Sequence, residues 1–254
     1  MDSDFFKDVE QHAIKITGGT CDVPILYRDV FAMAGVFTAP TLKLKELLPT
    51  SKLIPVEVYP GKGLLGFMAA DYRDTSIGPY KEFIIMVPAR YRPRFNLPLI
   101  PVLRMAASLS FEVFIWQLPL TSEIGLHAGI DIWGFPKFLA DIDFAEDERS
   151  VSCRLSENGE EILNLEVNKN AARMKTYFDY TIFSVKDREL LRTHVDGISS
   201  NLGRSFKPGA ARLTLGDHAM SRRIREIAPG KSMQTLYIPK GQLLLPEAEE
   251  RMAL

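Results

Sequence analysis

The sequence predicts a mainly β fold of the α+β class, in which antiparallel strands form a closed barrel and a few short helices pack outside it. Two observations support this prediction. Segments in which apolar and polar residues alternate with a period of two dominate the chain, and helical periodicity is confined to two short stretches. We expect residues 1–254 to form a single domain.

The alternating segments are the predicted strands. In chain order they are residues 64–70 (LLGFMAA), 82–88 (EFIIMVP), 111–118 (FEVFIWQL), 138–144 (FLADIDF), 174–185 (MKTYFDYTIFSV) and 211–217 (ARLTLGD). Residues 150–167 form two further runs on either side of Asn158 and Gly159. An Asn-Gly pair accepts the positive φ angles of a type I′ turn, so these two runs predict a β-hairpin.

The helices are expected at residues 41–49 (TLKLKELLP) and 218–228 (HAMSRRIREIA). Residues 89–120 contain an apolar run that is rich in arginine and proline. We interpret this segment as a surface loop that leads into a buried strand. The alternative is a lid or an oligomer contact, because apolar side chains on a proline-rich loop often need a partner surface.

Charge and composition exclude several classes of protein. The formal net charge is −1 and charges of both signs are interspersed, which argues against a nucleic-acid partner. Residues 98–120 are the most apolar region, but Arg104, Glu112 and several prolines interrupt it, so no membrane span is expected. The first residues lack the apolar core of a signal peptide, which predicts a cytoplasmic protein. Cys21 and Cys153 are expected to be buried free thiols.

No motif for a metal or cofactor is present. The four histidines have no metal-ligand spacing, and His218 is interpreted as a structural histidine rather than a base. The sequence also lacks a phosphate-binding glycine loop, a dinucleotide-binding fingerprint and a serine nucleophile elbow. We therefore expect no cofactor and no metal.

Lys137 is unusual because it lies in an apolar segment beside Trp133, Phe135 and Phe138. A lysine that forms a Schiff base attacks as the neutral amine, although a lysine in water is almost entirely charged at pH 7. Desolvation by aromatic neighbours, or a nearby positive charge, promotes the neutral form. The alternative is a lysine that extends from the end of a strand into water.

Four segments, in order, resemble the acetoacetate decarboxylase family. They are residues 27–31 (YRDVF), 74–82 (DTSIGPYKE), 129–138 (GIDIWGFPKF) and 212–220 (RLTLGDHAM). The resemblance implies a β-barrel or cone, often assembled into homo-oligomers. It also implies a lysine that forms a Schiff base with a small β-keto acid, and this family is a known example of such a lysine.

The resemblance assigns roles to individual residues. Lys137 falls on the Schiff-base lysine, and Glu82 falls on a glutamate that orders the site or moves a proton. Arg28 falls on an active-site arginine, whose planar fork suits a substrate carboxylate. Asp131 takes the place of an acid shortly before the lysine. We expect Asp131 and Trp133 to belong to the substrate site as well.

Two positions depart from the family pattern. Phe138 stands where the family has a second lysine directly after the nucleophile, and Met68 stands where it has a second glutamate. We expect both in the substrate site, although strand alternation points Phe138 away from Lys137. Asp71 lies three residues from Met68, on the opposite face of a strand, and is a poor substitute.

Three functions remain open at this stage. The first is a decarboxylase that acts on acetoacetate or a bulkier β-keto acid through an imine on Lys137. The second is another Schiff-base enzyme acting on a keto acid, namely an aldolase, a dehydratase or a cyclase. The third is a binding protein that holds a small carboxylate without turnover.

Overall fold

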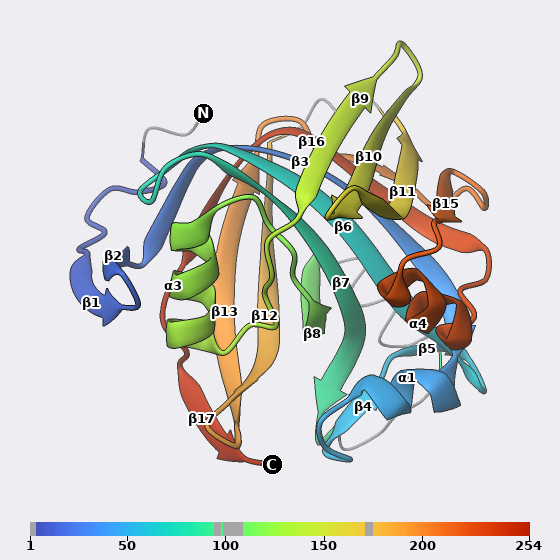
Figure 1. Cartoon of the computed structure of the whole chain (residues 1–254), viewed down its shortest axis with the longest axis horizontal. Helices are drawn as coiled ribbons and strands as arrows, with labels where there is room; N and C mark the ends of the chain where they lie inside the picture. Colours follow the sequence, from blue (N-terminus) through green and yellow to red (C-terminus); the bar gives the residue numbers. More distant parts are fainter. Residues whose placement is uncertain (1–3, 94–97, 99–108, 171–174) are drawn as a thin grey trace.

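The structure is a computed structural model that describes residues 4–93, 98, 109–170 and 175–254 (Figure 1). Strands dominate it, which confirms the predicted mainly β class. Within the described ranges, no helix is both long and apolar enough to cross a lipid bilayer. The three helices of these ranges are α1 (Thr41–Leu47), α3 (Glu123–Trp133) and α4 (Ala219–Ile227).

The main sheet has its central strands in the order β16-β3-β6-β7-β8-β12-β13. Their bounds are Ser232–Leu245, Ile25–Pro40, Lys62–Thr75, Tyr80–Tyr91, Ser110–Gln117, Thr176–Lys186 and Glu189–Ser199. A short pairing of β13 with β16, over residues 196–199, joins the two ends of this series. Because that contact is so short, the barrel closes over a small part of its height only.

Shorter strands extend this sheet at its margins. β14 (Gly203–Ser205) pairs with β16 and β17 (Glu250–Ala253) pairs with β13. β4 (Leu53–Pro55) pairs with β7, and β5 (Glu57–Tyr59) pairs with β6. A separate hairpin of β1 (His12–Ile16) and β2 (Gly19–Val23) precedes β3.

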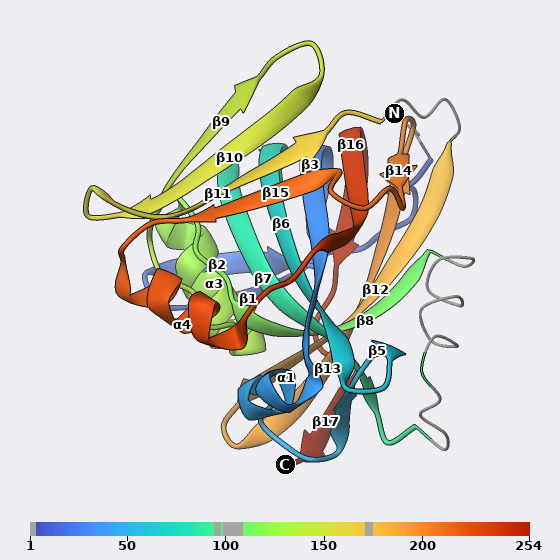
Figure 2. The same cartoon turned by 90° about the vertical axis from the view of Figure 1, so that its right-hand side faces the viewer.

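A second, four-stranded sheet covers one face of the main sheet (Figure 2). It consists of β9 (Asp141–Glu146), β10 (Ser150–Glu157), β11 (Glu160–Asn168) and β15 (Ala211–Leu215). A hydrophobic core between the sheets contains Phe67, Phe83 and Leu155, and α4 adds Ile224. The opposite faces of β3, β6 and β7 contribute to another core together with α3. Both faces of these three strands are therefore buried.

Several sequence predictions are confirmed. The two expected helices are α1 and α4, and the expected hairpin is β10–β11, in which Asn158 and Gly159 both have positive φ. Cys21 and Cys153 are buried free thiols.

The structure differs from the predicted closed, antiparallel barrel in two respects, of which the short closure between β13 and β16 is the first. β8 and β12 pair in parallel, whereas an all-antiparallel barrel was expected. The chain between them forms α3 and the strands β9, β10 and β11 of the second sheet, and this long connection permits a parallel pairing. Most of the arginine- and proline-rich part of residues 89–120, expected as a loop, lid or oligomer contact, lies outside the described residues.

Candidate active site around Lys137

The backbone around Lys137 is fixed from both sides. Helix α3 begins at Ser122, whose side chain accepts a hydrogen bond from the Gly125 N–H, and ends at Gly134 with φ +64°. A Cβ at position 134 would lie 2.3 Å from the Val185 carbonyl oxygen, so a glycine is required at this reversal. The chain then runs back beside residues 118–120, which donate backbone hydrogen bonds to the carbonyls of Pro136 and Phe138.

The side chain of Lys137 crosses α3 at Gly129. A Cβ built on Gly129 would lie 2.2 Å from Cε and 2.4 Å from Cδ of Lys137. The bare backbone of this glycine is therefore the passage by which the lysine reaches the interior. Only 5% of the Lys137 side chain is exposed, which rules out the alternative that it extends into water.

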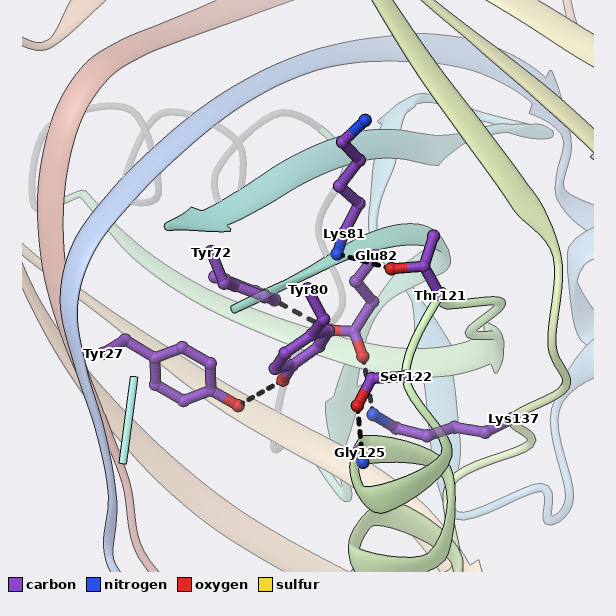
Figure 3. A network of polar contacts seen from close by, with 9 residues as sticks. All are labelled: Tyr27, Tyr72, Tyr80, Lys81, Glu82, Thr121, Ser122, Gly125 and Lys137. Carbon is purple, nitrogen blue, oxygen red and sulfur yellow. Dashed lines mark hydrogen bonds and ion pairs between the residues drawn. The ribbon is translucent and has the colours of Figure 1, made fainter. Parts of the chain in front are cut away.

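Glu82 is the direct partner of Lys137. The Lys137 Nζ lies 2.6 Å from the Glu82 Oε1, and 7% of the Glu82 side chain is exposed (Figure 3). The Tyr72 hydroxyl donates to the other carboxylate oxygen, Oε2, at 3.2 Å. This ion pair is buried and hydrogen-bonded, which is the arrangement that makes a charge pair tolerable in an apolar interior.

Aromatic rings surround the ion pair. The Lys137 Nζ lies 5.9 Å from the ring centroid of Tyr80 and 5.9 Å from that of Phe135. Tyr72 packs against Tyr80 and Tyr27, with ring centroids 4.8 and 4.6 Å apart. The hydroxyls of Tyr27 and Tyr80 are 2.8 Å apart. Desolvation therefore comes both from Phe135, two residues before Lys137, and from tyrosine rings that are distant in sequence.

The tyrosines remain neutral hydrogen-bond groups. Burial, and then the charge of Glu82, raises the pKa of Tyr72 and Tyr27. Burial, and then the neighbouring Tyr27 and Glu82, raises the pKa of Tyr80. At neutral pH each hydroxyl keeps its proton and can donate it in a hydrogen bond.

Lys137 and Glu82 line a cavity of about 90 Å³. Its polar lining residues are Tyr27, Tyr72, Tyr180, Glu82 and Lys137. The rest of the wall is apolar: Met68, Ile84, Met86, Val113, Ile115, Leu118, Phe135, Ile182, Val195, Leu243 and Leu245. A cavity of about 150 Å³ is enough to hold benzene, so this volume suits an acid of only a few carbon atoms.

The predicted site residues are only partly brought together. Lys137, Glu82 and Met68 line the cavity. Arg28 does not: its guanidinium lies 3.4 Å from Asp74 and its side chain is 40% exposed. Successive residues of a strand face opposite sides, and here the neighbouring Tyr27 takes the inward position.

Asp131 also lies away from the cavity. Its carboxylate accepts a hydrogen bond of 2.6 Å from the Thr17 N–H, and this bond lowers the pKa of the Asp131 carboxyl. Thr17 lies in the turn between β1 and β2. Asp131 therefore ties this hairpin to helix α3 and does not reach the ligand space.

Phe138 and Trp133 do not line the cavity. Phe138 packs into the core between the two sheets, the side expected from alternation. Trp133 is buried, stacks on Phe135 with ring centroids 5.8 Å apart, and donates from Nε1 to the Pro246 carbonyl. It supports Phe135, which forms the cavity wall.

The sequence did not identify the tyrosine cluster. Tyr27 and Tyr80 lie within the segments that resemble the family, but only strand pairing reveals their proximity. Tyr72 pairs with Tyr80 in the β6–β7 register, and Ala70 pairs with Glu82. The available signal was the spacing of Met68 and Tyr72, which puts both on one face of a strand.

The acids, histidines and cysteines of the described ranges form no group of three or more that could hold a metal ion. The polar groups that line the cavity are Lys137, its carboxylate partner Glu82 and the neutral hydroxyls around them.

Comparison with known proteins places these residues in context. A family model described as acetoacetate decarboxylase (ADC) matches residues 20–245. The search of curated proteins gave no match. A structure from structural studies of acetoacetate decarboxylase has 15% identity and a TM-score of 0.64, and the match covers 91% of this chain and 89% of that one.

Two further solved structures have the same fold. Acetoacetate decarboxylase from Legionella pneumophila has 17% identity and a TM-score of 0.62, with 99% of this chain and 94% of that one covered. The enduracididine biosynthesis enzyme MppR, complexed with pyruvate, has 12% identity and a TM-score of 0.63, with 87% of each chain covered.

Proposed function

Since this chain belongs to the acetoacetate decarboxylase family, we propose that it is a Schiff-base enzyme that removes carbon dioxide from a small β-keto acid through an imine on Lys137. The observation that carries the proposal is the buried Lys137 Nζ, which lies 2.6 Å from Glu82 on the wall of an otherwise apolar cavity. A buried lysine beside a proton acceptor is suited to nucleophilic attack on a carbonyl.

The first step is a proton transfer from Lys137 to Glu82 across their contact. It converts a buried ion pair into a neutral amine and a neutral carboxylic acid, and an apolar surrounding favours the uncharged forms. The free electron pair on Nζ then attacks the keto carbon. Glu82 returns its proton to the oxygen of the resulting carbinolamine, and the loss of water gives a cationic imine.

The second step is the loss of carbon dioxide. The electrons of the breaking carbon–carbon bond move into the imine, which becomes a neutral enamine. A negative carboxylate and a positive imine disappear together, so an apolar wall favours the transition state over the charged ground state. The aliphatic lining supports this step.

The last steps return the enzyme to its starting state. Glu82 has by then given up its first proton with the departing water; it takes up another from solvent and is placed to donate it to the enamine carbon. Water then hydrolyses the new imine and releases a ketone. Tyr72 holds Glu82 through Oε2 and leaves Oε1 free to exchange protons.

A different Schiff-base reaction is the second candidate. Met68 lies in the wall where the family has a second glutamate, so Glu82 is the only acid among the described lining residues. The related MppR is also described in complex with a condensation product of pyruvate and imidazole 4-carboxaldehyde. An aldol-type or dehydration reaction needs the same imine with a different bond formed or broken.

Carbon dioxide release from a panel of small β-keto acids tests the proposal. The wild-type protein should release it, and Lys137→Met should not. Lys81→Met is the matched control, because the Lys81 Nζ contacts the Ile142 carbonyl and does not line the cavity. Imine formation without carbon dioxide release would favour the second candidate. Ligand binding without any imine would favour a binding protein.

A further inference from the structure

The carboxylate of a keto acid needs a binding partner in the cavity. Arg28, the residue expected to supply it, lies outside with Asp74. Among the described lining residues the only cation is Lys137, whose Nζ forms the imine. The partner is therefore to be sought among neutral donors, which are the hydroxyls of Tyr27, Tyr72 and Tyr180.

The hydroxyls differ in what they already bind. Tyr72 donates its proton to Glu82. The hydroxyls of Tyr27 and Tyr80 hydrogen-bond to each other at 2.8 Å, and the two residues are 4% and 5% exposed. Two hydroxyls carry two protons, and their mutual bond uses one of them. No second acceptor for this pair is found within the described part of the chain.

A spare buried donor is costly unless something accepts from it. Burial raises the pKa of both tyrosines, so neither hydroxyl relieves this cost by losing its proton at neutral pH. Tyr27 lines the cavity, and therefore the spare O–H is available to a bound molecule. The same O–H cannot be satisfied by the aliphatic side chains that form most of the wall.

We propose that the Tyr27–Tyr80 hydroxyl pair binds the carboxylate of the keto acid, with Tyr80 donating to Tyr27 and Tyr27 donating to the substrate. This inference rests on the function proposed above. The pair lies beside the reacting amine, since the Tyr80 ring is 5.9 Å from the Lys137 Nζ and both rings contact Tyr72 (Figure 3).

Neutral donors suit decarboxylation better than an arginine does. An arginine would stabilise the carboxylate charge most strongly in the ground state, and that charge is lost as carbon dioxide leaves. A hydroxyl orients the carboxylate but stabilises its charge less than a cation does. The donation from Tyr80 polarises Tyr27 and strengthens the bond that Tyr27 makes.

The test compares two ketones of similar shape. Acetonylsulfonate is a β-keto anion that cannot lose carbon dioxide, and methyl isobutyl ketone is its uncharged counterpart. The concentration of each that gives half-maximal borohydride trapping on Lys137 is measured for the wild type, Tyr27→Phe and Tyr80→Phe. Tyr237→Phe is the matched control, because Tyr237 packs in the core between the two sheets. Thermal unfolding verifies that each variant is folded.

We expect Tyr27→Phe to weaken binding of the anion about tenfold to a hundredfold, the loss of one hydrogen bond to a charged group. The uncharged ketone should be affected less than threefold. Tyr80→Phe should act in the same direction with a smaller change, and Tyr237→Phe should change neither value. Equal losses for the two ketones in Tyr27→Phe would overturn the inference. So would an unaffected Tyr27→Phe together with a loss of anion binding in Arg28→Gln or in Tyr180→Phe, since Tyr180 also lines the cavity.

Failure of the proposed function gives a different result. If the wild type forms no adduct with either ketone, the Schiff-base function is wrong. Calorimetric titration of acetonylsulfonate into the wild type and Tyr27→Phe then still tests the hydroxyl pair, because it measures binding without imine formation. Equal affinities in that titration would refute the inference.

Discussion

Gly129 is the position at which one added methyl group should separate folding from function. Its backbone lies under the Lys137 side chain, where a Cβ would be 2.2 Å from Cε, 2.4 Å from Cδ and 3.0 Å from Nζ. The shortest ordinary van der Waals contact of a Cβ is 3.4 Å. In Gly129→Ala the Cε must therefore move by 3.4 − 2.2 = 1.2 Å to regain an ordinary contact.

The loss of stability should stay well below the about 3–5 kcal/mol expected for complete loss of the Lys137–Glu82 pair. The clashing atoms belong to a flexible side chain, which can move without disturbing the backbone. Alanine is also a better helix former than glycine by about 1 kcal/mol. The effect on reactivity should be large, because a misplacement of about 1 Å at a reacting group can cost about a hundredfold.

Borohydride trapping of acetoacetate on Lys137, read by peptide mass spectrometry, measures the reactivity, and thermal unfolding measures the stability. Gly125→Ala is the matched control: it adds the same methyl to the same helix, where its Cβ would meet Leu120 and Ser122 rather than Lys137. We expect Gly129→Ala to trap about a hundredfold more slowly and Gly125→Ala to trap within threefold of the wild type.

Wild-type trapping by a well-folded Gly129→Ala would refute this reasoning, because it would show that the amine does not depend on the passage over α3. Equal losses in both glycine variants would attribute the effect to helix damage rather than to Lys137.

Three further predictions concern the ion pair, the tyrosines and Asp131. Glu82→Gln leaves a buried lysine without its counter-charge and should lower the free energy of unfolding by about 3–5 kcal/mol. The double variant Lys137→Met, Glu82→Leu should recover most of that loss. Urea unfolding that shows no loss of stability in Glu82→Gln would contradict the prediction. Because the folded-state pKa values of Tyr27, Tyr72 and Tyr80 are raised, their contribution to stability is complete below the unfolded-state pKa of about 10 and falls above it. Urea midpoints measured from pH 8 upward should decline beyond about pH 10, and less steeply in Tyr72→Phe; equal slopes would exclude this tyrosine as a source. The lowered pKa of Asp131 implies that its bond to Thr17 is present at neutral pH and lost as the pH falls through that lowered pKa. Asp131→Asn should therefore speed amide hydrogen exchange at Thr17 at pH 7, and unchanged exchange would contradict the assignment.

Alternation is clearest in strands that have one face in a core and one outside it, although it also located parts of β6 and β7, which are buried on both faces. The β10–β11 hairpin is the clearest case, since Asn158 and Gly159 fix both the turn and the register. Alternation could not reveal the full extent of β3, where residues such as Met33 and Ala34 are buried on opposite faces. A strand that is buried on both sides has no polar face, so its sequence carries no period of two.

Helix α3 was not predicted because a cap and tertiary packing stabilise it, rather than the helix propensity of its residues. It contains two glycines and three β-branched isoleucines, which are poor helix formers. The Ser122 cap and the burial of Ile132 and Trp133 stabilise it instead. The prediction of a strand over residues 138–144 was wrong at its start: β9 begins at Asp141, and Lys137 lies in the connection that follows α3.

The candidate site also combines residues that the sequence indicated with residues that only the structure reveals. Lys137 and Glu82 came from a resemblance between short segments, and the structure brings them into contact. The tyrosines that complete the site depend on strand register, which no single segment encodes. The segment that suggested Arg28 also contains Tyr27, and only the structure shows that Tyr27 is the one that faces the cavity.

Trapping the imine tests the central claim most directly. Isotopically labelled acetoacetate and borohydride are added to the wild type, to Lys137→Met and to Lys81→Met, and the labelled peptide is identified by mass spectrometry. The account predicts one adduct in the wild type and in Lys81→Met, on Lys137, with a mass that shows loss of the carboxylate. It predicts no adduct in Lys137→Met. An adduct on another residue, or carbon dioxide release by Lys137→Met, would contradict it.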